Sequence, residues 1–217
     1  MCWQWSVDGG SWLHAVRNAP YTEWPGPGSA HGVAQDALEE FPIASATNLA
    51  RALARVGERM NADEDTLFLF LSAHGSSDHR LSAVQPPLEL TPLTPTALAR
   101  MLQDAGIKWR VIVVSACYSG GFIEPLRDDN TIVITASSAE RSSFGCATER
   151  DFTYFGEAYF RDALARTRSF TRAFELAKAA VAEREAQEKL EPSLPQMWVG
   201  AAIAERLKNA ADQPDQK

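Results

Sequence analysis

The stretch "VIVVSACYSGGF", residues 111–122, indicates the fold class of this chain. Four β-branched residues run directly into a turn of small residues that carries Cys117. A short continuous apolar run of this kind is typical of a strand that is buried on both faces of a sheet. Cys117 is therefore either an inert core thiol or a nucleophile held at the end of a strand.

Two further apolar runs, "TLFLFLSAHG" (66–75) and "NTIVITASS" (130–138), also end in small residues, and "PQMWVG" (195–200) predicts a last strand. Helices are expected between and after these strands, over residues 45–60, 94–105, 154–166 and 169–190. This alternation of strands and helices predicts an α/β fold with right-handed crossovers and a mainly parallel sheet.

Composition narrows the classes of function. The 217 residues are 45% hydrophobic and 23% charged, with a net charge of −7, which is typical of a soluble globular protein and argues against nucleic acid or an anionic membrane as partner. No apolar run is long enough for a membrane span, and no signal peptide is visible. Three cysteines suggest reduced thiols, so we expect a soluble, cytoplasmic protein.

The chain divides into three parts by composition. Residues 1–44 hold four of the six tryptophans among several prolines and glycines, and we expect an irregular segment there with at most one short strand. Residues 45–207 carry the periodic signals of the α/β domain. Residues 208–217 form a polar tail.

Two side chains capable of catalysis follow strands that are consecutive in the predicted order. A cysteine attacks as the thiolate and needs a group nearby that takes its proton. His74 follows the strand at 66–72 and lies 43 positions before Cys117, the length of one strand–loop–helix–strand unit. If the two strands are neighbours, both side chains emerge at the same sheet end, where parallel sheets place their sites. The small residues around them leave amide groups free to bind an oxyanion.

Other chemistries fit these residues less well. A nucleophile elbow needs glycines flanking the nucleophile, and a phosphatase loop needs an arginine soon after the cysteine; neither is present around Cys117. "HGSSDH" lacks the spacing of metal ligands, so no metal or other cofactor is expected, and His79 is predicted to be a polar loop residue.

"FLFLSAHGSSD" and "VIVVSACYSGG" resemble the His-Gly and Ala-Cys blocks of the legumain (asparaginyl endopeptidase) family, which has the caspase–haemoglobinase fold. "NTIVITASSAERSSFGCATERDFTYFGEAYF" and "PQMWVG" resemble later segments of the same family, in the same order. The resemblance covers residues 45–203 and implies a three-layer α/β/α sandwich of the caspase type.

The resemblance also implies the roles of the residues. Cys117 would be the nucleophile and His74 the general acid/base of a cysteine endopeptidase, while the amides of Gly75 and Cys117 would form the oxyanion hole. The same dyad would serve a transpeptidase or ligase, and an inactive interaction module of the same fold is a further alternative. The implied partner is a peptide or protein substrate, and either a monomer or a sheet-edge dimer fits.

Substrate specificity is where this sequence departs from the family. Legumains carry an acidic residue two positions before the nucleophile, which helps to bind a P1 asparagine; Ser115 stands there in this chain. Ser142, Ser143 and Glu157 match the remaining substrate-binding positions, so P1 would be asparagine or, if Glu157 dominates the pocket, a basic residue. Glu157 could equally be a first-turn acid at a helix N-terminus, and the two serines plain turn residues. Cys146 matches a legumain cysteine that we expect to pack.

Overall fold

The computed structural model describes residues 4–8, 44–84, 87–145 and 152–211. Its sheet has five strands in the order β1-β2-β3-β4-β5. These are β1 (Gln4–Asp8), β2 (Leu67–Ser72), β3 (Arg110–Ser115), β4 (Thr131–Thr135) and β5 (Gln196–Val199). The three central strands are parallel, and the two outer ones run antiparallel to their neighbours. The strands predicted at 66–72, 110–115 and around 131–135 are confirmed.

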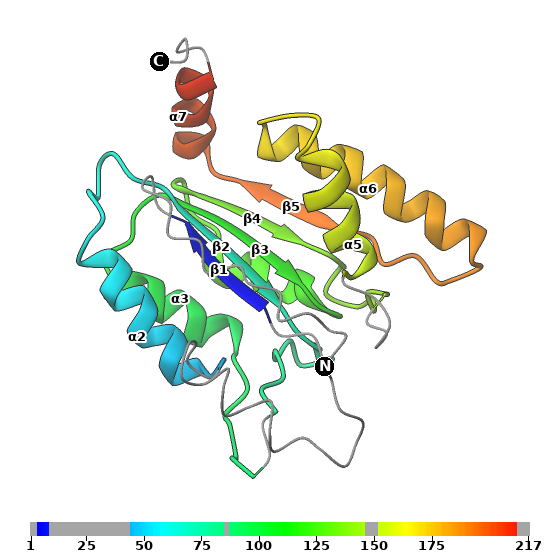
Figure 1. The fold of residues 1–217 in the computed structure, drawn as a ribbon, viewed down its shortest axis with the longest axis horizontal. Coiled ribbons are helices and arrows are strands. Elements are labelled where there is room, and N and C mark those ends of the chain that lie inside the picture. The colour runs from blue at the N-terminus through cyan, green and yellow to red at the C-terminus, as the bar shows by residue number, and fades with distance from the viewer. Residues whose placement is uncertain (1–3, 9–43, 85–86, 146–151, 212–217) are drawn as a thin grey trace.

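Helices cover both faces of this sheet, as Figure 1 shows. One face carries α2 (Ala46–Gly57) and α3 (Pro95–Asp104). The other carries the short α5 (Tyr154–Gly156), which continues into the π-helical η3 (Glu157–Ala163), and the long α6 (Phe170–Gln187). A last helix, α7 (Ala201–Ala211), follows β5. The predicted three-layer α/β/α sandwich is confirmed.

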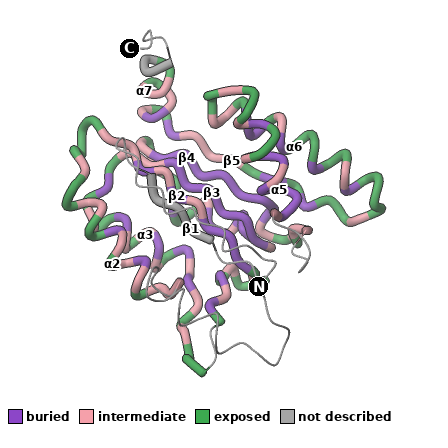
Figure 2. The backbone as a smooth tube through the Cα atoms, viewed as in Figure 1, coloured by how far each residue is buried: buried purple, intermediate pink, exposed green. Residues whose placement is uncertain are grey.

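The side chains of β3 explain its uninterrupted apolar sequence. Ile112 and Val114 pack into the core beneath α2 and α3, whereas Val111 and Val113 pack into the core beneath α6. All four are fully buried, as are most of the central strands in Figure 2. A strand between two helical layers must be apolar on both faces, and this removes the polar alternation of a half-exposed strand.

Local signals position α2 and α3. The Ser45 hydroxyl accepts a hydrogen bond from the Asn48 amide (3.2 Å), and the Thr94 hydroxyl accepts one from the Ala97 amide (3.1 Å). Pro95 occupies the start of α3, and Gly106, just after its end, has a φ of +66°. These contacts satisfy amides that have no partner inside a helix, and glycine tolerates the left-handed conformation.

The N-terminal segment contributes one strand. β1 pairs with β2, with Gln4 opposite Ser72, and lies in the part of the chain where the sequence allowed one short strand. The prediction of irregular structure for the rest of 1–44 falls on residues 9–43, outside the described residues. No helix of the described ranges is both long and apolar enough to cross a membrane.

Candidate active site

The register of β2 and β3 brings the two predicted catalytic residues to one edge of the sheet. Ser72 and Ser115, the last residues of these strands, lie opposite each other in the parallel pairing. His74 and Cys117 each follow two residues later, at the carboxyl end of the sheet. Their side chains are accessible, since His74 is exposed and Cys117 half-buried.

A pocket of 260 Å³ opens at this edge and includes both residues in its wall. Its lining comes from three parts of the chain, namely residues 73–74 after β2, residues 115–117 after β3, and residues 143–145 with Thr153. Four of the predicted site residues therefore share one pocket: His74, Ser115, Cys117 and Ser143. Gly75, Ser142 and Glu157 are not part of its lining.

Gly75 lies directly against the peptide of Cys117. A Cβ atom at this position would be 2.0 Å from the Cys117 carbonyl oxygen and 3.2 Å from the Cys117 nitrogen, so only glycine fits. Within the described ranges, the amide N–H groups of Gly75 and Cys117 donate to no backbone carbonyl or side chain. Two neighbouring N–H groups that are not used in other hydrogen bonds can together bind an oxyanion.

The turn after Cys117 is held by buried hydrogen bonds. The Ser137 hydroxyl donates to the Ala116 carbonyl (3.0 Å) and accepts from the Ser119 amide (3.1 Å), and both serines are fully buried. Tyr118, between these contacts, has a φ of 56°, which is uncommon for a residue with a side chain. Such conformations persist only where the surroundings fix them, and here Ser137, just after the end of β4, supplies hydrogen bonds on both sides of Tyr118.

The cysteine sulfur contacts the backbone of Ser143. The Ser143 amide donates to Cys117 Sγ (3.2 Å), and the thiol lies 3.3 Å from the Ser143 carbonyl oxygen, to which it can donate. Among the residues that the structure describes, the sulfur therefore forms its hydrogen bonds with the Ser143 backbone rather than with His74. Catalytic hydrogen bonds in a protein without substrate are often long and form only when substrate binds.

Two buried residues of the pocket lining, Ser115 and Thr153, carry hydroxyl groups. Ser115 Oγ and Thr153 Oγ1 lie 2.8 Å apart, and Thr153 also accepts from the Gly156 amide (3.0 Å) as the N-cap of α5. Sequence reasoning missed Thr153 as a pocket residue. Its position before a helix predicts only a cap, and the contact with Ser115 spans 38 positions, which no local pattern reveals.

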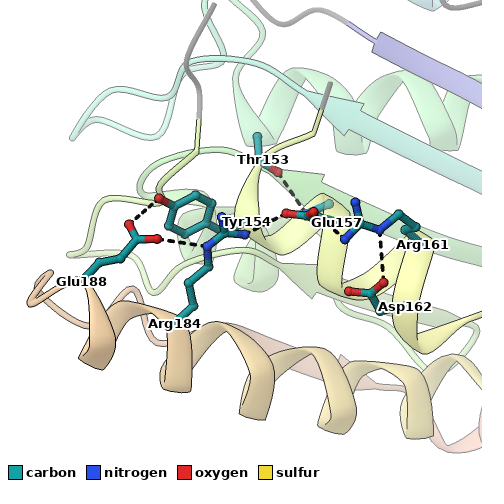
Figure 3. A network of polar contacts seen from close by, with 8 residues as sticks. Thr153, Tyr154, Glu157, Arg161, Asp162, Arg184 and Glu188 are labelled. Carbon is teal, nitrogen blue, oxygen red and sulfur yellow. Dashed lines mark hydrogen bonds and ion pairs between the residues drawn. The ribbon is translucent and has the colours of Figure 1, made fainter. Parts of the chain in front are cut away.

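Glu157 is engaged in ion pairs beside the pocket, as Figure 3 shows. Its carboxylate lies 2.7 Å from Arg184 Nη1 and 2.5 Å from Arg161 Nη2. Desolvation opposes the charge of Arg184, but its hydrogen bonds to Glu157 and Glu188 outweigh that effect and raise its pKa. The sequence had left Glu157 as either a substrate-binding residue or a helix-start acid, and its observed partners are two arginines.

Comparison with known families identifies the chain. The model of the peptidase C13 family matches residues 50–205, which include all of the pocket residues described above. The chain belongs to the peptidase C13 family. This is the legumain family, so the resemblance seen in the sequence is confirmed.

The fold of this C13 peptidase has relatives among solved structures. Caspase-1 from Spodoptera frugiperda superimposes with a TM-score of 0.53 at 16% sequence identity, over 73% of this chain and 69% of that one. At such low identity the likeness concerns the fold alone. No curated protein matches the chain. The C13 assignment and the caspase-like fold support a cysteine peptidase that acts on proteins.

The pocket of this C13 peptidase has one imidazole, that of His74, and one thiol, that of Cys117, in its lining. Across the residues that the structure describes, no three or more histidine, cysteine, aspartate or glutamate side chains gather where they could hold a metal ion. Cys117 is the free thiol of this region. The predictions for Cys146 fall on a residue outside the described ranges.

Proposed function

We propose that this C13 peptidase cleaves peptide bonds with Cys117 as nucleophile and His74 as general acid/base. His74 takes the proton of the Cys117 thiol, the sulfur attacks the carbonyl carbon, and the imidazolium gives that proton to the leaving amine as the C–N bond breaks, which leaves a thioester on Cys117. His74 then takes a proton from water while the hydroxide attacks the thioester, the C–S bond breaks to release the acid product, and His74 returns the proton to the sulfur, so that the thiol is restored. The observation that carries this proposal is that both side chains line one pocket, just beyond the paired carboxyl ends of β2 and β3.

The oxyanion of each tetrahedral intermediate would be bound by the amides of Gly75 and Cys117. Three facts support this assignment. Gly75 fits against the Cys117 peptide only because it has no side chain, neither N–H group donates to another group of the described residues, and the proposed nucleophile belongs to the same peptide. Such a donor contributes about 3–4 kcal/mol to the transition state when its removal is measured.

Before substrate binds, the backbone of Ser143 would hold the Cys117 thiol in a resting position through the two hydrogen bonds described above. Its amide already donates to Sγ (3.2 Å). A rotation of the Cys117 side chain about χ1 would exchange this contact for one with the substrate carbonyl. Ser143 therefore acts through its backbone, which makes the identity of its side chain secondary.

The P1 side chain that fits this pocket is uncharged. Besides His74, the lining holds hydroxyl, apolar and small residues, and Ser115 takes the place of the acidic residue of legumains. A basic P1 would need Glu157, but that carboxylate is already neutralised by Arg161 and Arg184. The hydroxyls of Ser115 and Thr153 can exchange hydrogen bonds with a neutral polar P1 group such as an amide.

Turnover of a peptide library that varies P1 tests this proposal, with Cys117→Ala as control. We expect cleavage after neutral residues in the wild-type chain, at least about 10⁴-fold above the variant. No turnover of any peptide would favour the inactive module. Joined products in the presence of an added amine, without hydrolysis, would favour a transpeptidase.

A further inference from the structure

His79, which the sequence predicted to be an ordinary loop residue, is half-buried between the two catalytic loops. Its Nδ1 lies 3.0 Å from the backbone carbonyl oxygen of Tyr118, the residue after the nucleophile. Because a carbonyl can only accept, Nδ1 carries the hydrogen, and the bond forms with a neutral or a charged imidazole. The contact spans 39 positions of sequence.

The imidazole of His79 also lies against the backbone of Gly121. A Cβ atom on Gly121 would be only 2.1 Å from His79 Cγ and 2.5 Å from Nδ1, so the ring occupies the place of a side chain there. Gly121 belongs to η2 (Ser119–Phe122), which directly continues the turn that carries Cys117. His79 therefore touches the cysteine turn at two points, Tyr118 and Gly121.

His74 and His79 belong to the same loop after β2. Hydrogen bonds and an ion pair within this loop fix its conformation. Gly75 forms an antiparallel bridge with Leu81, in which the Ser82 amide donates to the His74 carbonyl (2.8 Å). Between these ends, the Asp78 carboxylate accepts from Ser76 and pairs with Arg80 (2.6 Å). His79 has a φ of 62° at the tip, which turns its ring toward the cysteine turn.

We propose that His79 is a positioning residue that holds the Cys117 turn against the His74 loop. Gly75, at the start of this loop, and His79, at its tip, contact successive peptides, those of Cys117 and Tyr118. The imidazole thereby sets the position of the nucleophile relative to both the acid/base and the oxyanion amides. This inference rests on the proposed function, since it concerns the alignment of the same dyad.

Replacement of His79 by asparagine and by aspartate separates the hydrogen bond from other effects. Both residues tolerate a positive φ and have the same shape, but only the amide of asparagine can donate to the Tyr118 carbonyl. We expect His79→Asn to keep kcat within about threefold of wild type, and His79→Asp to lower kcat by about 10- to 100-fold with little change in KM, because a small misplacement of reacting groups has an effect of that size.

A second variant tests the packing without touching His79. Gly121→Ala places a methyl group where the imidazole lies, and we expect it to lower kcat by about 10-fold or more, since it displaces the ring. In the double variant His79→Ala with Gly121→Ala the ring is absent, so the added methyl should lower kcat by no more than about twofold beyond His79→Ala alone. Such non-additivity is the signature of two groups in direct contact.

The kcat of each variant is compared with that of the wild-type chain, and the urea unfolding midpoint of every variant is measured alongside. The inference holds if kcat follows the donor at position 79 while the midpoints of the asparagine and aspartate variants agree. It is overturned if these two variants have equal kcat, or if kcat falls only in proportion to the loss of folded protein. A wild-type chain that turns over no peptide would instead refute the proposed function itself.

Discussion

The hydroxyl groups of Ser115 and Thr153 lie 2.8 Å apart in the lining of the pocket that contains Cys117, and they join the end of β3 to the start of α5. Ser115 is 1% exposed and Thr153 is 6% exposed, so neither hydroxyl has ready access to water. Thr153 also caps α5 through the Gly156 amide. The Thr153 side chain thus both lines the pocket and caps the start of α5.

Thr153→Val should destabilise the protein more than either of its two roles alone would suggest. The change removes the cap and leaves Ser115 Oγ buried without its partner, and we expect a loss of about 2–3 kcal/mol in the free energy of unfolding. Ser115→Ala removes the hydroxyl pair but keeps the cap, and should lose about 1 kcal/mol. Urea unfolding of both variants measures the difference.

Thr94→Val is the matched control for this comparison, because Thr94 caps α3 and has no hydroxyl partner in a pocket among the described residues. We expect a loss of about 1 kcal/mol from the missing cap alone. If Thr153→Val proves no more harmful than Thr94→Val, the contact with Ser115 does not contribute to stability.

Glu157→Gln should leave the P1 preference unchanged. The carboxylate is bound by Arg161 and Arg184, so its loss weakens two partly exposed ion pairs, worth about 1 kcal/mol together, without altering the pocket lining. Glu188→Gln removes another carboxylate from Arg184 and serves as the matched control. P1 profiles of both variants measure this, and a selective loss of cleavage after lysine or arginine in Glu157→Gln would restore Glu157 as the specificity residue.

Gly75→Ala should abolish most of the activity. The new Cβ would lie 2.0 Å from the Cys117 carbonyl oxygen, so the two peptides must separate, and the amides that we propose bind the oxyanion lose their alignment. We expect kcat to fall by about 10²- to 10³-fold, which is the effect of losing one oxyanion donor.

Gly106→Ala is the control for Gly75→Ala, because its Cβ meets no atom within 4 Å but its φ is +66°. It should lower the free energy of unfolding by about 1–2 kcal/mol and leave kcat unchanged. Steady-state kinetics on both folded variants distinguish the two cases, and equal activity of Gly75→Ala and Gly106→Ala would exclude Gly75 from the oxyanion hole.

Much of the fold could be predicted from the sequence because its signals are local. The uninterrupted apolar run before Cys117 reports burial on both faces, and Thr94, Pro95 and Gly106 mark the bounds of α3. The spacing of β2 and β3, one strand–loop–helix–strand unit, is compatible with the parallel pairing that the structure shows. These features depend on neighbours within a few positions or on general chain geometry.

The contacts that shape the site were beyond sequence reasoning because they join distant positions. Thr153 and Ser115 are 38 positions apart, and His79 and Tyr118 are 39 apart. His79 gave the same signal as any polar loop histidine, and Glu157 the same as any helix-start acid. Their partners could be found only once the loops were placed in space.

The proposed cleavage reaction requires Cys117 and His74 to act together. The value of kcat/KM for a peptide with a neutral P1 residue measures this cooperation directly. Cys117→Ala, His74→Ala and the double variant are compared with wild type. We predict a loss of at least about 10³-fold for each single change and no further loss in the double variant, because residues that act as one unit are strongly non-additive. Full activity of His74→Ala, or losses that multiply in the double variant, would contradict the account.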